Sequence, residues 1–246
     1  PGTDTNWSYT KNDKYWDKNT VKLDKVTIDV VKEAPTSLNL FQDGQADDVP
    51  LSGELAQQMK SDPNFITLKA ASTFYLEPNQ IEENSPYRNA NLRKALSYAI
   101  DRKALVDQIL ANGSTVPEGL VPAGLAADPK TDEDFAKESG NDIVYDVDKA
   151  KESWKKAKDE LGISTLSVDL LIDDTDNAKK MAEYLQGSLS ETLDGLKVSV
   201  SPVPFSVRLD RSNKGDFEIA VSAWGADYAD PSSFLDLFVT GNAYNR

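Results

Sequence analysis

The strongest constraint on the fold is a regular alternation of helix and strand patterns between residues 148 and 223. Apolar residues recur at helical spacing in three segments and alternate with polar residues in three others. The helical segments contain Ala150, Trp154, Ala157 and Leu161; Ala178, Met181, Ala182, Leu185, Leu189 and Leu193; and Val207 and Leu209. The alternating segments contain Leu166, Val168, Leu170 and Ile172; Leu196, Val198 and Val200; and Phe217, Ile219, Val221 and Ala223. This order predicts an α/β fold in which right-handed crossovers join a mostly parallel sheet.

The chain before residue 148 has shorter and less regular patterns. A period of two predicts strands within residues 21–31 and 65–76, and Pro78 is expected to end the second strand. Residues 1–20 and 114–145 lack a clear period, so we expect irregular structure there.

Capping residues predict where several helices begin and end. The expected ends are Thr36 or Ser37 with Gly44, Asn89 or Asn91 before Leu92, Asp101 with Gly113, and Asp148 with Gly162.

Composition excludes several classes of function. The chain has 27 Lys and Arg against 41 Asp and Glu, a formal charge of −14, which disfavours nucleic acid and anionic membranes as partners. It contains neither His nor Cys, so thiol nucleophiles, Ser-His-Asp triads and imidazole or thiolate metal sites are not available. Carboxylate chemistry, metals with oxygen ligands, or binding without covalent chemistry remain.

The chain begins with Pro1 and Gly2, without an initiator Met or a signal-peptide pattern, so we expect a processed or excised piece. No apolar run approaches the roughly 20 residues that a membrane-spanning helix needs.

The loop after the last predicted strand is the first candidate for a ligand site. Open α/β sheets bind ligands beyond the carboxyl ends of their strands, and here Asp227 lies between Trp224 and Tyr228. A carboxylate beside aromatic rings suits a ligand ammonium group. The structural alternative is that Asp230 caps a following helix with Pro231 at its first position, and that Trp224 belongs to the core.

Other acidic clusters have simpler explanations. Residues 173–177 suggest a calcium loop, but the sixth position lacks the required Gly, and an acidic helix N-terminus explains them. Glu77 with Glu82 and Glu83 could form a carboxylate pair, but no apolar pocket is visible in the sequence to raise a pKa there. We therefore expect no metal site and no enzyme activity.

Five segments occur in the order of a known family. They are Tyr15–Lys18, Val21–Val26, Leu38–Asp47, Asn91–Arg102 and Trp224–Pro231. Together they make the chain resemble the oligopeptide-binding, extracytoplasmic solute-binding proteins of ABC importers.

This resemblance implies periplasmic-binding-protein-like lobes of type II, with mixed, mostly parallel sheets. Residues 1–74 would form part of the first lobe, and residues 75–246 most of the second lobe. The receptor would close over an oligopeptide in an interlobe cleft and deliver it to an ABC permease, without a cofactor. Its place would be the cell surface or periplasm, held by a lipid anchor outside this piece.

The resemblance also implies a binding site. The family's acid that pairs with the peptide ammonium corresponds to Asp227, and an aromatic wall corresponds to Phe205. Trp224, Ala226 and Tyr228 complete the expected ligand-binding set. Ser212 and Val221 stand where some relatives carry Arg for a peptide carboxylate. The alternatives are a receptor of the same fold for a dipeptide, a peptide pheromone or a metal chelate, and a carboxylate-based hydrolase.

Overall fold

The computed structural model describes residues 5–139 and 144–245. The chain forms two compact units, Pro1–Leu51 and Ser52–Arg246. These units are not the predicted lobes, whose boundary at residues 74 and 75 stays a prediction about the whole receptor.

The first unit is an antiparallel hairpin followed by a helix. Strands β1 (Asn6–Thr10) and β2 (Lys25–Asp29) pair so that Trp7 lies opposite Ile28, and helix α1 spans Ala34–Gln42. The strand predicted within residues 21–31 and the helix are confirmed. The prediction of irregular structure over residues 1–20 was wrong for β1. Its polar sequence forms a strand only because it pairs with β2. The predicted cap of α1 was also wrong, since the helix starts after Glu33.

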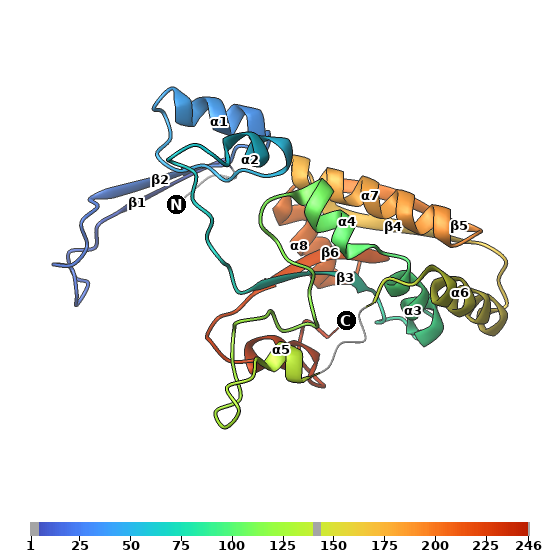
Figure 1. Cartoon of the computed structure of the whole chain (residues 1–246). Coiled ribbons are helices and arrows are strands. Elements are labelled where there is room, and N and C mark those ends of the chain that lie inside the picture. Colours follow the sequence, from blue (N-terminus) through green and yellow to red (C-terminus); the bar gives the residue numbers. More distant parts are fainter. Residues whose placement is uncertain (1–4, 140–143, 246) are drawn as a thin grey trace. The chain divides into compact units, whose positions relative to one another are not determined.

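The second unit is built on a four-stranded sheet with the order β3-β6-β4-β5 (Figure 1). The strands are β3 (Ser72–Pro78), β4 (Leu166–Asp173), β5 (Leu196–Val203) and β6 (Ile219–Gly225). Strand β4 runs parallel to β5 and β6, and β3 runs antiparallel to β6. The predicted α/β fold with a mixed, mostly parallel sheet is confirmed.

The predicted strand over residues 65–76 forms only in its second half. Gly225 at the end of β6 pairs with Ser72 at the start of β3. In the part of the chain that the structure describes, no strand lies beside residues 65–71, so their alternation does not produce a strand.

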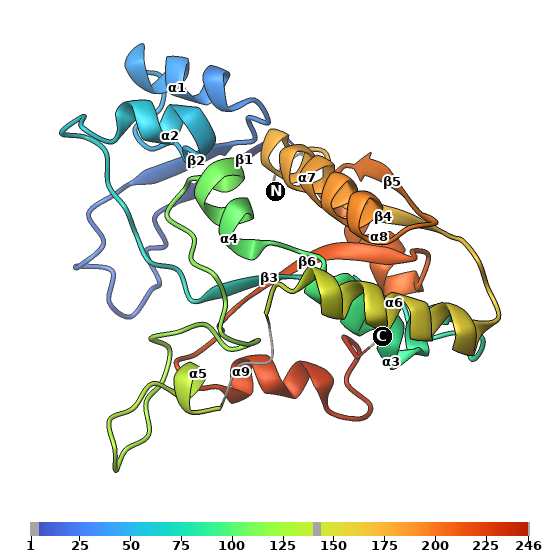
Figure 2. The same ribbon diagram turned by 45° about the vertical axis from the view of Figure 1, so that its right-hand side comes forward.

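Three helices cover the apolar face of the sheet (Figures 1 and 2). They are α3 (Ala90–Tyr98), α6 (Val147–Leu161) and α7 (Asp176–Thr192). Leu92, Trp154 and Leu189 from these helices share one buried cluster with Val168 and Leu170 of β4. Helix α8 (Phe205–Lys214) lies on the other face of the sheet. The crossovers therefore place helices on both faces of the sheet.

Short helices complete the second unit. They are α2 (Gly53–Met59), η1 (Pro86–Arg88), α4 (Arg102–Ala104), the π-helix η2 (Leu105–Leu110), α5 (Phe135–Glu138), α9 (Ser232–Leu235) and η3 (Asp236–Phe238). No helix among the described residues is long and apolar enough to span a membrane.

The helix ends follow the predicted capping chemistry in part. Asn89 and Asp101 accept hydrogen bonds from the first turns of α3 and α4, and Gly162 ends α6 with a φ of 66°, as predicted. Asp146, not Asp148, caps α6. The helix after Asp101 ends at Ala111, with a φ of 43°, before it reaches Gly113. The sequence predicted these helices correctly but misplaced two of their ends by two residues.

Phe217 lies outside the strand that its alternation with Ile219 predicted. It precedes β6 and packs with Leu171 and Ala220, whereas Ile219 and Val221 belong to the cluster on the opposite face. The alternation therefore starts at Ile219.

Candidate functional site

The candidate site is the loop that connects β6 to α9, at the edge of the sheet where β4, β5 and β6 end. Strand β6 pairs with β4 only at Ile219 and Ala220 and continues to Gly225. The loop residues Ala226–Asp230 follow at once. Trp224, Ala226, Asp227 and Tyr228, four of the five predicted ligand residues, thus come from one short segment.

Hydrogen bonds fix the main chain of this loop on two sides. The Ala226 N–H donates to the carbonyl oxygen of Ala71 over 2.8 Å. The Asp227 N–H donates to the Oγ of Ser233, also over 2.8 Å. The Trp224 Nε1 donates to the carbonyl oxygen of Ser233 over 2.8 Å. The first two bonds hold the main chain at Ala226 and Asp227, and the third orients the Trp224 indole.

The Asp227 side chain projects from this fixed backbone into solvent. Asp227 and Tyr228 are exposed and Trp224 is half-buried. The Trp224 ring meets the Tyr244 ring edge-on, with centroids 5.1 Å apart. Within the described residues, the structure shows no hydrogen bond or ion pair to the Asp227 carboxylate. It can therefore accept charge-assisted hydrogen bonds from a cationic ligand group.

Asp230 has the structural role that the alternative explanation predicts. Its Oδ1 accepts hydrogen bonds from the Ser232 N–H, over 2.9 Å, and from the Ser232 Oγ, over 2.6 Å. These two bonds hold the pKa of Asp230 below its usual range. Helix α9 begins at Ser232, one residue later than expected. The two acids of the loop thus have different roles. The Asp230 carboxylate stabilises the start of α9, and the Asp227 carboxylate does not.

Phe205 lies apart from the other predicted site residues. It is the first residue of α8, after β5, and β4 separates β5 from β6. Its side chain is exposed, and the Arg208 guanidinium carbon lies 5.1 Å from its ring centroid. Arg208 is buried and its Nε donates to the Asp173 Oδ1 over 2.6 Å. Phe205 shares the edge of the sheet with the loop, but its part in a common site stays a prediction.

The other acidic clusters serve the fold. Thr175 caps α7 by accepting a hydrogen bond from the Ala178 N–H, and Asp176 lies in the first turn, as the helix explanation predicts. Glu77 is buried and accepts a hydrogen bond from the Ser222 Oγ over 2.8 Å. The described residues contain no cluster of three or more acidic side chains that could hold a metal ion.

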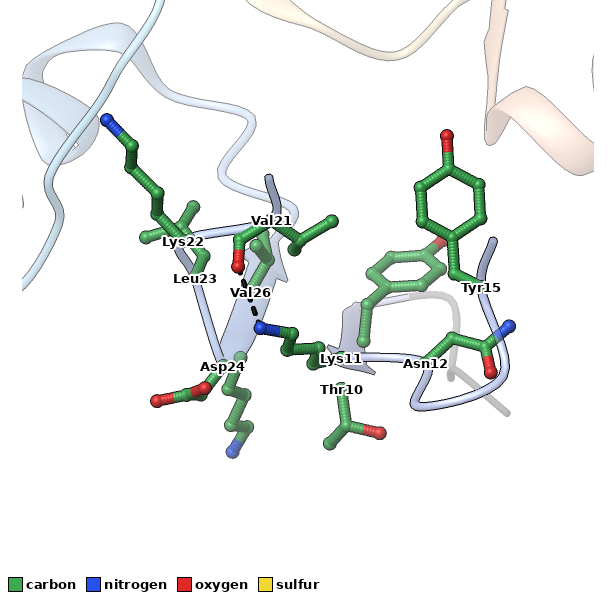
Figure 3. A pocket seen from close by; sticks show the side chains of 11 residues that line it. Thr10, Lys11, Asn12, Tyr15, Val21, Lys22, Leu23, Asp24 and Val26 are labelled. Atoms are coloured by element: carbon green, nitrogen blue, oxygen red, sulfur yellow. Dashed lines mark hydrogen bonds between the residues drawn. The ribbon is translucent and has the colours of Figure 1, made fainter. Parts of the chain in front are cut away.

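Two shallow pockets are lined by residues outside this loop, and the sequence did not indicate either of them. The first, of about 370 Å³, belongs to the β1–β2 hairpin (Figure 3). Lys11 reaches across it and donates its Nζ to the Val21 carbonyl oxygen over 2.8 Å. The second, of about 320 Å³, is lined by Glu54, Lys180, Glu183 and residues near them. The pockets and the exposed carboxylate of Asp227 are therefore at different places in the chain. We place the candidate site at the loop after β6, because the hairpin pocket is wide open and the Lys11 amine in it already donates to a main-chain carbonyl.

Comparisons with known proteins identify a family. A family model described as bacterial extracellular solute-binding proteins, family 5 Middle, matches residues 2–246. A dipeptide-binding protein of Lactococcus lactis is 37% identical over 99% of this chain and 46% of its own length.

Solved structures agree with this result. OppA of Listeria monocytogenes bound to peptide has a TM-score of 0.94 and 43% identity, over 99% of this chain and 48% of its own. The pheromone receptor PrgZ has a TM-score of 0.93 and 45% identity, over 99% of this chain and 48% of its own. The chain thus spans about half the length of these relatives.

Proposed function

The chain belongs to the bacterial extracellular solute-binding proteins of family 5, and from this we propose that it is part of the oligopeptide-binding component of an ABC importer. The relatives described above are named as a dipeptide-binding protein, a peptide-bound OppA and a pheromone receptor, and none of these names describes an enzyme. Delivery of the peptide to a membrane permease, and a lipid anchor at the cell surface or in the periplasm, are parts of this proposal. The similarity to a peptide-bound OppA supports the choice of ligand.

The observation that carries the proposal is the Asp227 carboxylate, which is exposed on a backbone that hydrogen bonds hold in place. The α-ammonium group of a peptide would donate hydrogen bonds to it, with Trp224 and Tyr228 beside it and Phe205 as a further wall. Because every peptide has the same main chain, hydrogen bonds to main-chain groups would hold the rest of the ligand regardless of its side chains. Closure of the receptor would then exclude water and strengthen the ion pair.

Replacing Asp227 by Ala in the full-length receptor tests this proposal. We expect peptide affinity to fall by about 1 kcal/mol or more, since the ammonium loses its charged partner in a closed site. Isothermal titration calorimetry with a synthetic tetrapeptide measures the change. The Asp230→Ala variant of the same loop should bind more nearly like wild type. Equal affinity of wild type and Asp227→Ala would contradict the assignment.

A receptor for another cargo is the second candidate. The relatives include a dipeptide-binding protein, a pheromone receptor and a heme-binding protein, so each of the three cargoes has a named precedent. Competition between a library of longer peptides and dipeptides for the full-length receptor separates these cargoes. A metal chelate would be recognised by the failure of every peptide to compete.

A further inference from the structure

We propose that Ser233 is a positioning residue that holds the peptide-binding carboxylate of Asp227 in its binding orientation. The inference rests on the proposed function, because it assigns a role to Ser233 only if Asp227 binds the ligand ammonium. It adds a buried side chain outside the predicted ligand-binding set.

Ser233 connects three parts of the loop through three different atoms. Its Oγ accepts from the Asp227 N–H and its carbonyl oxygen accepts from the Trp224 Nε1, each over 2.8 Å. Its own N–H donates to the Asp230 carbonyl oxygen over 3.0 Å. Trp224 and Asp227, two of the predicted ligand residues, therefore share Ser233 as a hydrogen-bonding partner.

The burial of Ser233 gives this partner a fixed position. Ser233 is only 5% exposed and precedes Phe234, which is fully buried. Leu237, one turn further along, is 4% exposed. The buried side chains of Phe234 and Leu237 hold α9 and η3 in the interior. A movement of the loop would therefore leave the Ser233 oxygen atoms in place and break the bond to the Asp227 N–H. The position of the Asp227 backbone is thereby tied to the packing of α9.

Only one of the three bonds depends on the Ser233 side chain. In Ser233→Ala, the bonds to Trp224 and Asp230 remain because they use main-chain atoms, whereas the Asp227 N–H loses its acceptor. An N–H without a partner favours rotation of the peptide group toward water. We expect the Asp227 carboxylate to turn with it. In Ser233→Thr the acceptor oxygen is kept.

The test measures preference for a free amino group, which a general loss of structure would not change selectively. The full-length receptor is incubated with an equimolar pool of synthetic tetrapeptides, half with a free amino end and half N-acetylated. Mass spectrometry of the bound fraction gives the ratio of the two forms. We expect wild type to enrich the free amine, Asp227→Asn to abolish the enrichment, and Ser233→Ala to lower it about fivefold. Ser233→Thr should restore it.

Ser212→Ala is the matched control. Ser212 is also a buried serine, on α8, and its Oγ makes no hydrogen bond in the described structure. Its removal should leave the enrichment at the wild-type value. Thermal unfolding checks that each variant folds, and if Ser233→Ala does not fold, Ser233→Cys keeps the volume with a much weaker acceptor and replaces it.

The outcomes separate the two proposals. If Ser233→Ala, or Ser233→Cys in its place, enriches the free amine as wild type does while Asp227→Asn does not, the role of Ser233 is overturned and that of Asp227 stands. If wild type shows no enrichment, or Asp227→Asn keeps it, the proposed function of the loop itself is overturned.

Discussion

Two acidic loops leave the same edge of the sheet, and the fold uses their carboxylates differently. By the loop after β4 we mean the residues from Asp173, the last residue of β4, to Asn177 in the first turn of α7. In it, Asp173 pairs with the buried Arg208, Asp176 lies in the first turn of α7, and the Asn177 Oδ1 accepts a hydrogen bond from the Ser52 Oγ. In the loop after β6, hydrogen bonds hold the main chain and leave the Asp227 carboxylate exposed.

This difference shows why an acid at the end of a strand is weak evidence for a ligand site by itself. A carboxylate that stabilises a helix end or neutralises a buried guanidinium already has a partner. An exposed carboxylate on a fixed backbone can bind a ligand with little further ordering, and ordering lowers affinity. The loop after β6 meets this condition, whereas Asp173 in the loop after β4 does not.

The largest expected effect is on stability, through the loop after β4. Arg208→Met should lower the free energy of unfolding by about 2 kcal/mol, because Arg208 is buried and the Asp173 carboxylate, which is 29% exposed, loses its partner. Arg211→Met on the same helix is the control, since its ion pair with the exposed Asp216 is worth less than about 1 kcal/mol. Chemical denaturation of the full-length variants measures both. Similar losses would mean that the Asp173–Arg208 pair has no special structural role.

A smaller effect should separate stability from binding. Asp176→Asn removes a favourable charge at the N-terminus of α7 and should cost about 0.5 kcal/mol of stability, with unchanged peptide affinity. Asp227→Asn should do the reverse, with about tenfold weaker peptide binding and little change in stability. Denaturation and calorimetry on the same two variants provide the measurements. A loss of affinity in Asp176→Asn would show that both loops bind the ligand.

The smallest effect is an acid sensitivity of the loop after β6. The hydrogen bonds from Ser232 lower the pKa of Asp230 in the folded state. The stability that these bonds contribute is therefore fully present above the pKa of Asp in the unfolded chain, about 4. It is lost as the pH falls through the lower pKa of Asp230 in the folded state. Asp230→Asn should make the stability of the receptor less dependent on pH below about 4. Identical pH profiles for the variant and wild type in thermal unfolding would exclude this contribution.

The sequence was most informative where structure depends on neighbouring residues. The period of the apolar residues predicted β4, α7, β5 and β6, and the position of Asp227 after a strand predicted its place at the edge of the sheet. Contacts between distant segments could not be predicted in this way. Strand β1 forms through pairing with β2, and Arg208 meets Asp173 across 35 positions.

The bond between Ser233 and Asp227 was missed for a different reason. The two residues are six positions apart, but the bond depends on how α9 is seated on its buried side chains. A serine just inside a short predicted helix gives no signal of that contact. Ser233 could be found only after the loop and the helix were placed together.

A crystal structure of the full-length receptor with a bound tetrapeptide tests the central claim most directly. The quantity to measure is the distance from the peptide's amino nitrogen to the nearest oxygen of the Asp227 carboxylate. We predict about 2.8 Å, the length of a charge-assisted hydrogen bond, with the Asp227 N–H still bound to Ser233. A peptide whose amino end lies beyond about 4 Å from Asp227, or pairs with an acid of the loop after β4, would contradict the account.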